Sequence, residues 1–206
     1  MYTPTTFAQD NADQLSSLIE AYSFGLLIVP DGAGGAEISH LPFVLDSTHG
    51  PHGKLLVHVA RANPIWKVAL ERQRAIAVFS GPHAYISPQW YEVPRANVPT
   101  WNYAVAHVHG RVTGPMERHE LLALLDRLVD RYESNSAKPW QRADLDTAIR
   151  DNLLNAIVGF SLAIDRIEGK FKLSQNRSPA DREHVRDELM KRHNPEDVEL
   201  ARLMAR

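Results

Sequence analysis

The chain has 206 residues, of which 44% are hydrophobic and 23% charged, with no cysteine and a formal net charge of −2 at pH 7. These values are typical of one soluble globular domain, exclude disulfides and thiolate metal sites, and offer no electrostatic basis for nucleic acid as the main partner. No signal-like N-terminus and no apolar run near the ~20 residues of a membrane helix is present, so we expect a cytoplasmic protein with no membrane partner.

The N-terminal part of the chain is predicted to be one helix followed by hairpin strands. Apolar spacing predicts a helix over Phe7–Glu20 and then a buried strand over Ser23–Val29. The glycine-rich stretch Pro30–Glu37 indicates a turn. A dinucleotide-binding loop is the alternative, but strand Ile38–Leu45 follows the glycines where that motif needs a helix. A further strand is expected at Leu55–Ala60.

The central part is predicted to contain one helix and three strands. Asparagine followed by proline is a typical helix start, because the asparagine side chain caps the helix and proline is favoured in its first turn. Alternation of two residue classes marks a strand with two differently lined faces. The expected elements are a helix from Asn63-Pro64 to about Arg74, strands at Ala75–Ser80 and Ala84–Ser87 around Gly81-Pro82, and a strand through Val105–Val112.

The C-terminal part adds most of the helices. Helices are expected at Glu117–Tyr132 and Leu145–Ala156, a strand at Ile157–Ile167, and a charged helical tail at about 179–206. About six or seven strands at hairpin spacing, with helices grouped around them, predict a mainly β (α+β) protein: an antiparallel barrel with peripheral helices. We expect a single domain over residues 1–206.

Two polar segments are candidate ligand sites. Arg61 follows a strand directly and precedes a capped helix, and free helix amides beside a guanidinium suit a phosphate; the alternative is a solvated arginine at an ordinary cap. Lys170–Arg177 offers donors and acceptors to a ring edge or phosphate, or is simply a polar exit from a strand. Between them, Gly81–Arg111 concentrates tryptophan, tyrosine and proline, which indicates a rigid wall for a planar ligand or a subunit contact.

Two other patterns are weaker evidence for a functional site. His107 and His109 share one strand face, so a metal is geometrically possible, but half-buried histidines bonded to neighbours explain them better, and we expect no metal site. Charges of both signs interleave in the tail after Ser178, which predicts a solvated or subunit-bracing helix. Direct binding to duplex DNA is therefore doubtful from charge. No nucleophile elbow is present, and the catalytic residues, if any, are unknown.

Five segments together resemble the PaiB-type negative transcriptional regulators, which belong to the FMN-binding split-barrel group. The resemblance covers nearly the whole chain in the family's order. The segments are SHLPFVLD (Ser39–Asp46), HVARANP (His58–Pro64), ISPQWY (Ile86–Tyr91), VPTWNYAVAHVHG (Val98–Gly110) and KFKLSQNR (Lys170–Arg177).

The resemblance implies a six-stranded antiparallel Greek-key split barrel of the FMN-binding type, and a homodimer with FMN sites at the subunit interface. It places three groups of residues near the cofactor. These are His58, Arg61 and Asn63 near the phosphate and ribityl chain; Ser87, Gln89, Trp90, Trp101 and Asn102 along the isoalloxazine ring; and Lys172, Ser174, Gln175 and Asn176 near the phosphate or ring edge.

Three functions follow as hypotheses. The first is an FMN-binding protein acting as a PaiB-like negative transcriptional regulator. The second is an FMN-dependent oxidoreductase, linked to NAD(P)H or to a small molecule, although no nicotinamide motif is evident. The third, by analogy with other split barrels, is a haem-binding or haem-degrading protein. A visible spectrum of the purified protein distinguishes them first.

Overall fold

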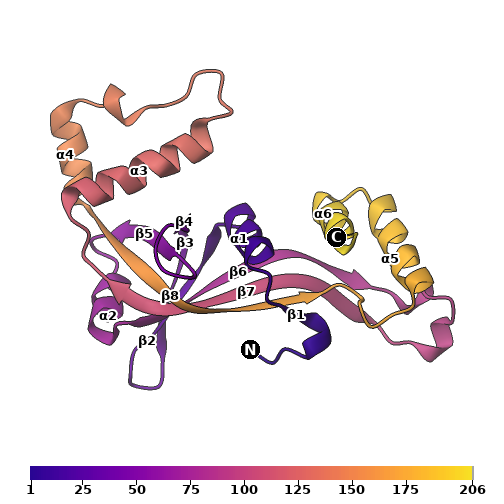
Figure 1. Ribbon diagram of the computed structural model, residues 1–206. Coiled ribbons are helices and arrows are strands. Elements are labelled where there is room, and N and C mark those ends of the chain that lie inside the picture. The colour runs from indigo at the N-terminus through magenta and orange to yellow at the C-terminus, as the bar shows by residue number, and fades with distance from the viewer. Residues whose placement is uncertain (206) are drawn as a thin grey trace. The chain divides into compact units, whose positions relative to one another are not determined.

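The computed structural model describes residues 1–205, which form one mainly antiparallel sheet and several helices (Figure 1). Its strand order is β3-β2-β6-β7-β8-β5-β4, and β1 pairs with β8. The strands are β1 (Ala8–Gln9), β2 (Phe24–Pro30), β3 (Ala36–Pro42), β4 (Val44–Asp46), β5 (Lys54–Ala60), β6 (Arg74–Ile86), β7 (Thr100–Thr113) and β8 (Ile157–Lys172). The helices are α1 (Ala12–Ala21), α2 (Ile65–Arg72), α3 (Arg118–Glu133), α4 (Thr147–Asn155), α5 (Pro179–Lys191) and α6 (Pro195–Met204).

The chain forms two compact units. Unit 1 comprises Met1–Tyr22, Phe79–His107 and Glu168–Arg206, and unit 2 comprises Ser23–Val78 and Val108–Ile167. The long strands β6, β7 and β8 therefore contribute residues to both units. The single domain expected over the chain is not tested by this division and stays a prediction.

In unit 2, the glycine-rich segment after β2 is a turn, as predicted. The carboxylate of Asp31 accepts hydrogen bonds from the backbone amides of Ala33 and Gly35 at 2.7 and 2.9 Å. Gly32 and Gly34 have φ of +81° and +100°, a backbone region that residues with a Cβ rarely adopt. The turn joins β2 to β3, which pair antiparallel from Phe24 opposite Pro42.

Helix α3 in unit 2 lies within one residue of its predicted bounds. Glu117 and Glu120 form a capping box at its start. Its buried leucines Leu124 and Leu128 pack with Val44 and Leu56 of β4 and β5 in one hydrophobic cluster. The apolar stripe of the sequence thus fixes which face of α3 meets the sheet.

In unit 1, the first helix starts later than predicted. The side chain of Asn11 accepts a hydrogen bond from the amide of Gln14 at 2.9 Å, so α1 begins at Ala12, while Phe7 lies in a short 3-10 turn. Within the described residues, the tail expected to be helical over about 179–206 contains the two helices α5 and α6. Ser178 and Asn194 cap α5 and α6, and the two helices lie side by side (Figure 1).

The expected six-stranded split barrel needs correction: within the described residues the sheet has eight strands, and it is not closed, because β3 and β4 end the strand order. Buried Phe43, whose amide donates to Ser23 O, separates β3 from β4. The predicted break at Gly81-Pro82 is also absent. β2 pairs with β6 only over Ile76–Val78, so Pro82 lies beyond that pairing, where a strand edge tolerates its missing N–H.

Candidate functional site

His58 presents an unsatisfied polar atom in unit 2. It lies on β5, where its sequence neighbours Val57 and Val59 are buried, and the residue itself is half-buried. Its Nδ1 atom is buried and has no hydrogen-bond partner among residues 1–205. Burial lowers the pKa of His58 from its ordinary value of 6.5. A neutral imidazole with a free Nδ1 fits a ligand hydroxyl, which can either donate or accept.

The lowered pKa of His58 predicts an acid-sensitive fold. Above pH 6.5 the ring is neutral in both states, and stability is at its maximum with respect to this group. As the pH falls below 6.5, the unfolded chain takes up the proton first, so the free energy of unfolding falls until the folded-state pKa is passed. Denaturation midpoints measured between pH 8 and pH 5 test this. The variant His58→Gln is expected to have a flatter pH profile than the wild type, and an identical slope would contradict the assignment.

Arg61 follows β5 and is held by backbone carbonyls. Its Nε donates to Asn155 O at 2.7 Å and its Nη2 to Ile157 O at 3.0 Å. The side chain is exposed but oriented, and Arg61 lies four residues before Ile65, the first residue of α2. An oriented guanidinium close to a helix N-terminus retains the capacity to bind an anion.

Helix α2 begins at Ile65 with Pro64 as its N-cap, one residue later than predicted, and the side chain of Asn63 bonds the first helical amide. Its Oδ1 accepts from the amide of Ile65 at 3.0 Å, and its Nδ2 donates to Ser39 Oγ at 3.1 Å. Both polar atoms of this amide therefore have partners within unit 2. Helix α2 ends at Arg72, two residues before its expected end.

Unit 1 holds the other nine predicted residues, and Lys172 is the one with the most unusual surroundings. Its ammonium donates to Thr100 Oγ1 at 2.6 Å and to the carbonyl of Trp101 at 2.5 Å. Burial, followed by the charges of Lys170 and Arg177, lowers the pKa of Lys172. A half-buried cation among like charges, which donates to a hydroxyl and a carbonyl, is typical of a place that receives an anion or a polar ring edge.

Asn102 and Ser174 form a buried pair. Asn102 is 1% exposed and donates from Nδ2 to Ser174 Oγ at 2.9 Å; the same Nδ2 lies 3.7 Å from the sulfur of Met204. Gln175 bonds within its own turn, to Phe171 O and from the amide of Leu173. Asn176 is exposed. Their roles as cofactor ligands stay predictions, whereas their bonds show that Asn102, Ser174 and Gln175 shape the end of β8.

The aromatic wall contains a short 3-10 turn that carries the half-buried Trp90, and two exposed rings, those of Tyr85 and Trp101. Ser87 accepts from the amide of Gln89 at 3.2 Å and so starts the short 3-10 turn that carries Trp90. Trp90 is half-buried beneath the guanidinium of Arg192, 6.0 Å from the ring centroid. Trp101 is 53% exposed, and Tyr85 meets it edge to face at 6.0 Å. These two rings on β6 and β7 form the uncovered part of the wall.

Three charged residues of unit 1 lie outside the twelve predicted cofactor ligands. Lys170 and Arg177 begin and end the candidate segment Lys170–Arg177, and two-residue spacing on a strand places Lys170 on the same face as Lys172. Arg192 lies outside every predicted segment. The aromatic partners of Arg177 and Arg192 could not be predicted, because they are about eighty or more residues away in sequence. Their partners depend on how α5 and the segment before it fold back.

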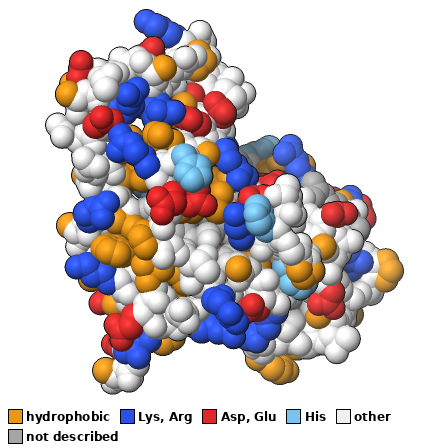
Figure 2. Space-filling view, turned by 60° about the vertical axis from the view of Figure 1, so that its left-hand side comes forward, with side chains coloured by type: hydrophobic (Ala, Val, Ile, Leu, Met, Phe, Trp, Pro, Cys, Tyr) orange, Lys and Arg blue, Asp and Glu red, His pale blue; other side chains and the backbone are white. Residues whose placement is uncertain are grey.

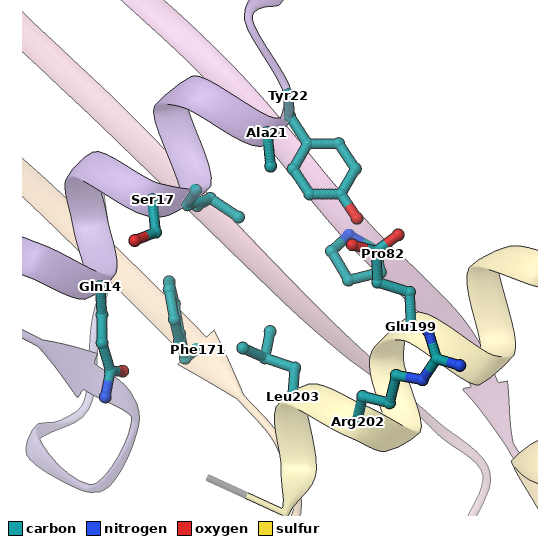
Figure 3. Close-up of a pocket in the computed structure, with 10 residues that line it drawn as sticks. Gln14, Ser17, Ala21, Tyr22, Pro82, Phe171, Glu199, Arg202 and Leu203 are labelled. Atoms are coloured by element: carbon teal, nitrogen blue, oxygen red, sulfur yellow. The ribbon is translucent and has the colours of Figure 1, made fainter. Parts of the chain in front are cut away.

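A separate cleft in unit 1 was not predicted. It measures about 350 Å³ and lies between α1 and α6, with Phe171 and Pro82 from the sheet (Figure 3). Tyr22 and Glu199 face each other across it; burial, and then a hydrogen bond to Glu199, raise the pKa of Tyr22. None of the twelve predicted site residues lines this cleft. Among residues 1–205 no cluster of three or more potential metal-ligating side chains was found.

Solved structures show which class of fold this is. The chain is similar to the FAD and heme binding protein of Mycobacterium smegmatis, with a TM-score of 0.60 and 17% identity over 80% of this chain and 73% of that one. It is also similar to the flavocytochrome Anf3 of Azotobacter vinelandii, with a TM-score of 0.58 and 13% identity over 80% and 69% of the two chains. The fold is a mainly antiparallel sheet with helices, similar to the flavin-binding split barrels.

The sequence comparison defines the family. The chain belongs to the family described as "Putative FMN-binding domain", whose sequence profile matches residues 1–166, and it is a PaiB homologue. It is 33% identical over 204 residues to the Protease synthase and sporulation protein PAI 2 of Bacillus subtilis (strain 168), covering 99% of this chain and 96% of that protein. The expected family is thus confirmed. In the described part of the chain, no helix is long and apolar enough to cross a membrane.

Proposed function

We propose that this chain binds FMN and acts as a PaiB-type negative transcriptional regulator. The observation that carries the cofactor assignment is the buried, unpartnered Nδ1 of His58, three residues before Arg61, in a segment that the FMN-binding family profile matches. A buried polar atom without a partner is rare in a native protein, and a bound ligand is one way to satisfy it. A hydroxyl-rich ribityl chain that ends in a phosphate satisfies both side chains.

The proposal assigns a part of FMN to each group of residues. His58, Arg61 and Asn63 would contact the phosphate and ribityl chain, with Arg61 as the main charge partner. Trp90 and Trp101, with Ser87, Gln89 and Asn102, would line the ring; Lys172, Ser174, Gln175 and Asn176 would meet its polar edge or the phosphate. FMN itself supplies redox chemistry when it is bound, whereas the protein supplies placement and electrostatics.

We infer a homodimer with FMN sites at the subunit interface. The exposed aromatic rings of unit 1 support it, because Trp101 and Tyr85 are 53% and 42% exposed on adjacent strands. Exposed aromatic clusters are typical of interaction surfaces. Light scattering coupled to size-exclusion chromatography measures the mass directly, and a monomer at every concentration would contradict this part of the proposal. A cytoplasmic location stays a prediction.

Repression through direct duplex binding has little electrostatic support. The net charge is −2, and basic and acidic side chains are interspersed on the face shown in Figure 2. Proteins that bind DNA directly usually present a contiguous basic surface. We therefore propose that regulation acts through a partner or through metabolism. A gel-shift series from low to physiological salt tests this, and specific binding at physiological salt would overturn it.

Titration with flavins tests the cofactor assignment. Apoprotein is titrated with FMN and with riboflavin while flavin fluorescence is followed. We expect FMN to bind about tenfold or more tightly than riboflavin, because only FMN has the phosphate that Arg61 would pair with. Equal affinities would remove the phosphate assignment, and absence of binding would refute the cofactor proposal. Rapid bleaching of bound FMN by a nicotinamide donor would favour the oxidoreductase alternative.

A further inference from the structure

The loop that carries Trp90 is held by residues that follow the sheet. This Trp90 loop, Ser87–Pro99, joins β6 to β7 and contains two short 3-10 turns. Its own backbone hydrogen bonds are local ones within those turns. Val93 and Val98 are 60% and 69% exposed, so the loop has little apolar burial of its own at these positions. Its conformation therefore depends on contacts from elsewhere in unit 1.

Three residues of the segment after β8, beyond the residues matched by the family profile, supply such contacts. The carboxylate of Asp181 in α5 accepts a hydrogen bond from the amide of Glu92 at 2.8 Å. The guanidinium of Arg177 lies 4.7 Å from the ring centroid of Tyr91 and donates to Asn97 Oδ1 at 2.6 Å. These contacts hold the loop at its middle and at its far end.

The third of these residues, Arg192, contacts Trp90 itself. Arg192, just after α5, places its guanidinium over the Trp90 ring at 6.0 Å from the centroid. Its Nε lies 3.1 Å from the carboxylate of Asp197, whose side chain is 4% exposed in the first turn of α6. A buried carboxylate needs a cation, so Asp197 fixes where Arg192 can lie. Arg192 in turn covers one side of the indole.

We propose that Arg192 is a positioning residue: held by Asp197, it fixes the Trp90 loop in the orientation in which Trp90 meets the flavin. The C-terminal helical hairpin of α5 and α6 thereby positions Trp90 in a site whose other residues lie on or next to the strands of the sheet. The flavin part of this inference rests on the proposed function, whereas the effect on the loop does not. Order in the loop before binding lowers the entropy lost when the ligand is bound.

The experiment compares three single variants of the full chain. Arg192→Gln removes the guanidinium, and Asp197→Asn removes the charge that holds it. Arg186→Gln is the matched control, because Arg186 lies on α5, the helix that Arg192 follows, and its partners Glu183 and Asp187 are on that helix too. Each protein is measured in the absence of flavin by amide hydrogen exchange over residues 87–99, and then by its dissociation constant for FMN.

We expect Arg192→Gln to speed exchange in the loop about tenfold and to weaken FMN binding about tenfold, while the control matches the wild type. Unchanged exchange in Arg192→Gln overturns the proposal whatever the FMN result. Faster exchange with unchanged FMN affinity overturns the positioning role. If the wild type binds no FMN, the proposed function fails, and exchange alone decides whether Arg192 holds the loop. Should Asp197→Asn fail to fold, Arg192→Gln still decides, because its side chain is 46% exposed.

Discussion

Replacement of Lys172 with methionine is expected to weaken FMN binding about thirtyfold, or about 2 kcal/mol, without a comparable loss of stability. The reason is that the ammonium is poorly accommodated in the folded protein: burial, Lys170 and Arg177 all lower its pKa. A cation in such surroundings gains a favourable partner when an anion or a polar ring edge binds beside it. Methionine keeps the length and apolar contacts of the side chain.

Lys170→Met is the matched control for this experiment. Lys170 lies two residues away on the same face of β8, but its ammonium contacts the backbone of Tyr2 and the rings of Tyr2 and Tyr103. We expect its FMN affinity to fall less than that of Lys172→Met. Fluorescence titration gives both constants, and urea denaturation gives both stabilities. Equal affinities for wild type and Lys172→Met would remove Lys172 from the proposed site.

Substitution of Gly110 with valine is expected to lower the free energy of unfolding by about 3 kcal/mol. Gly110 is buried on β7, and a Cβ there would overlap the carbonyl oxygen of Ala163 on β8 and lie 2.9 Å from Leu162 Cγ. The overlapping atom belongs to the backbone of a paired strand, so only a shift of the strands relieves it. A lowering of the melting temperature by about 6 to 12 °C is expected for a chain of this size.

The neighbouring substitution Arg111→Val provides the comparison. Arg111 is exposed on the opposite face of the same strand, and valine is favoured in strands, so stability should stay within about 0.5 kcal/mol of the wild type. Calorimetry of both variants separates the steric effect from any general sensitivity of β7. A Gly110→Val protein as stable as the Arg111→Val protein would show that β7 and β8 are less closely apposed than described.

Elements defined by local rules were predictable. The capping box and leucine stripe of α3 place it within one residue, and Asn63-Pro64 places the start of α2 within one residue as well. The points at which strands are interrupted or continuous were harder to predict from the sequence. The Gly81-Pro82 pair suggested two strands, yet β6 is continuous there, because the effect of proline on a strand depends on whether a neighbour needs its N–H. Which strand lies beside Pro82 depends on how the strands pair in the tertiary structure.

By itself, the sequence determined the family, the strand-rich composition, the helix caps and the residue types around a predicted flavin site. These are properties of neighbouring residues, or of short motifs that follow one another along the chain. Only the tertiary structure decided that Lys172 bonds Thr100, 72 positions away, and that Arg192 covers Trp90. Such pairs depend on strand register and on the path of α5 and α6, which arise from the packing of the whole unit and from no local preference.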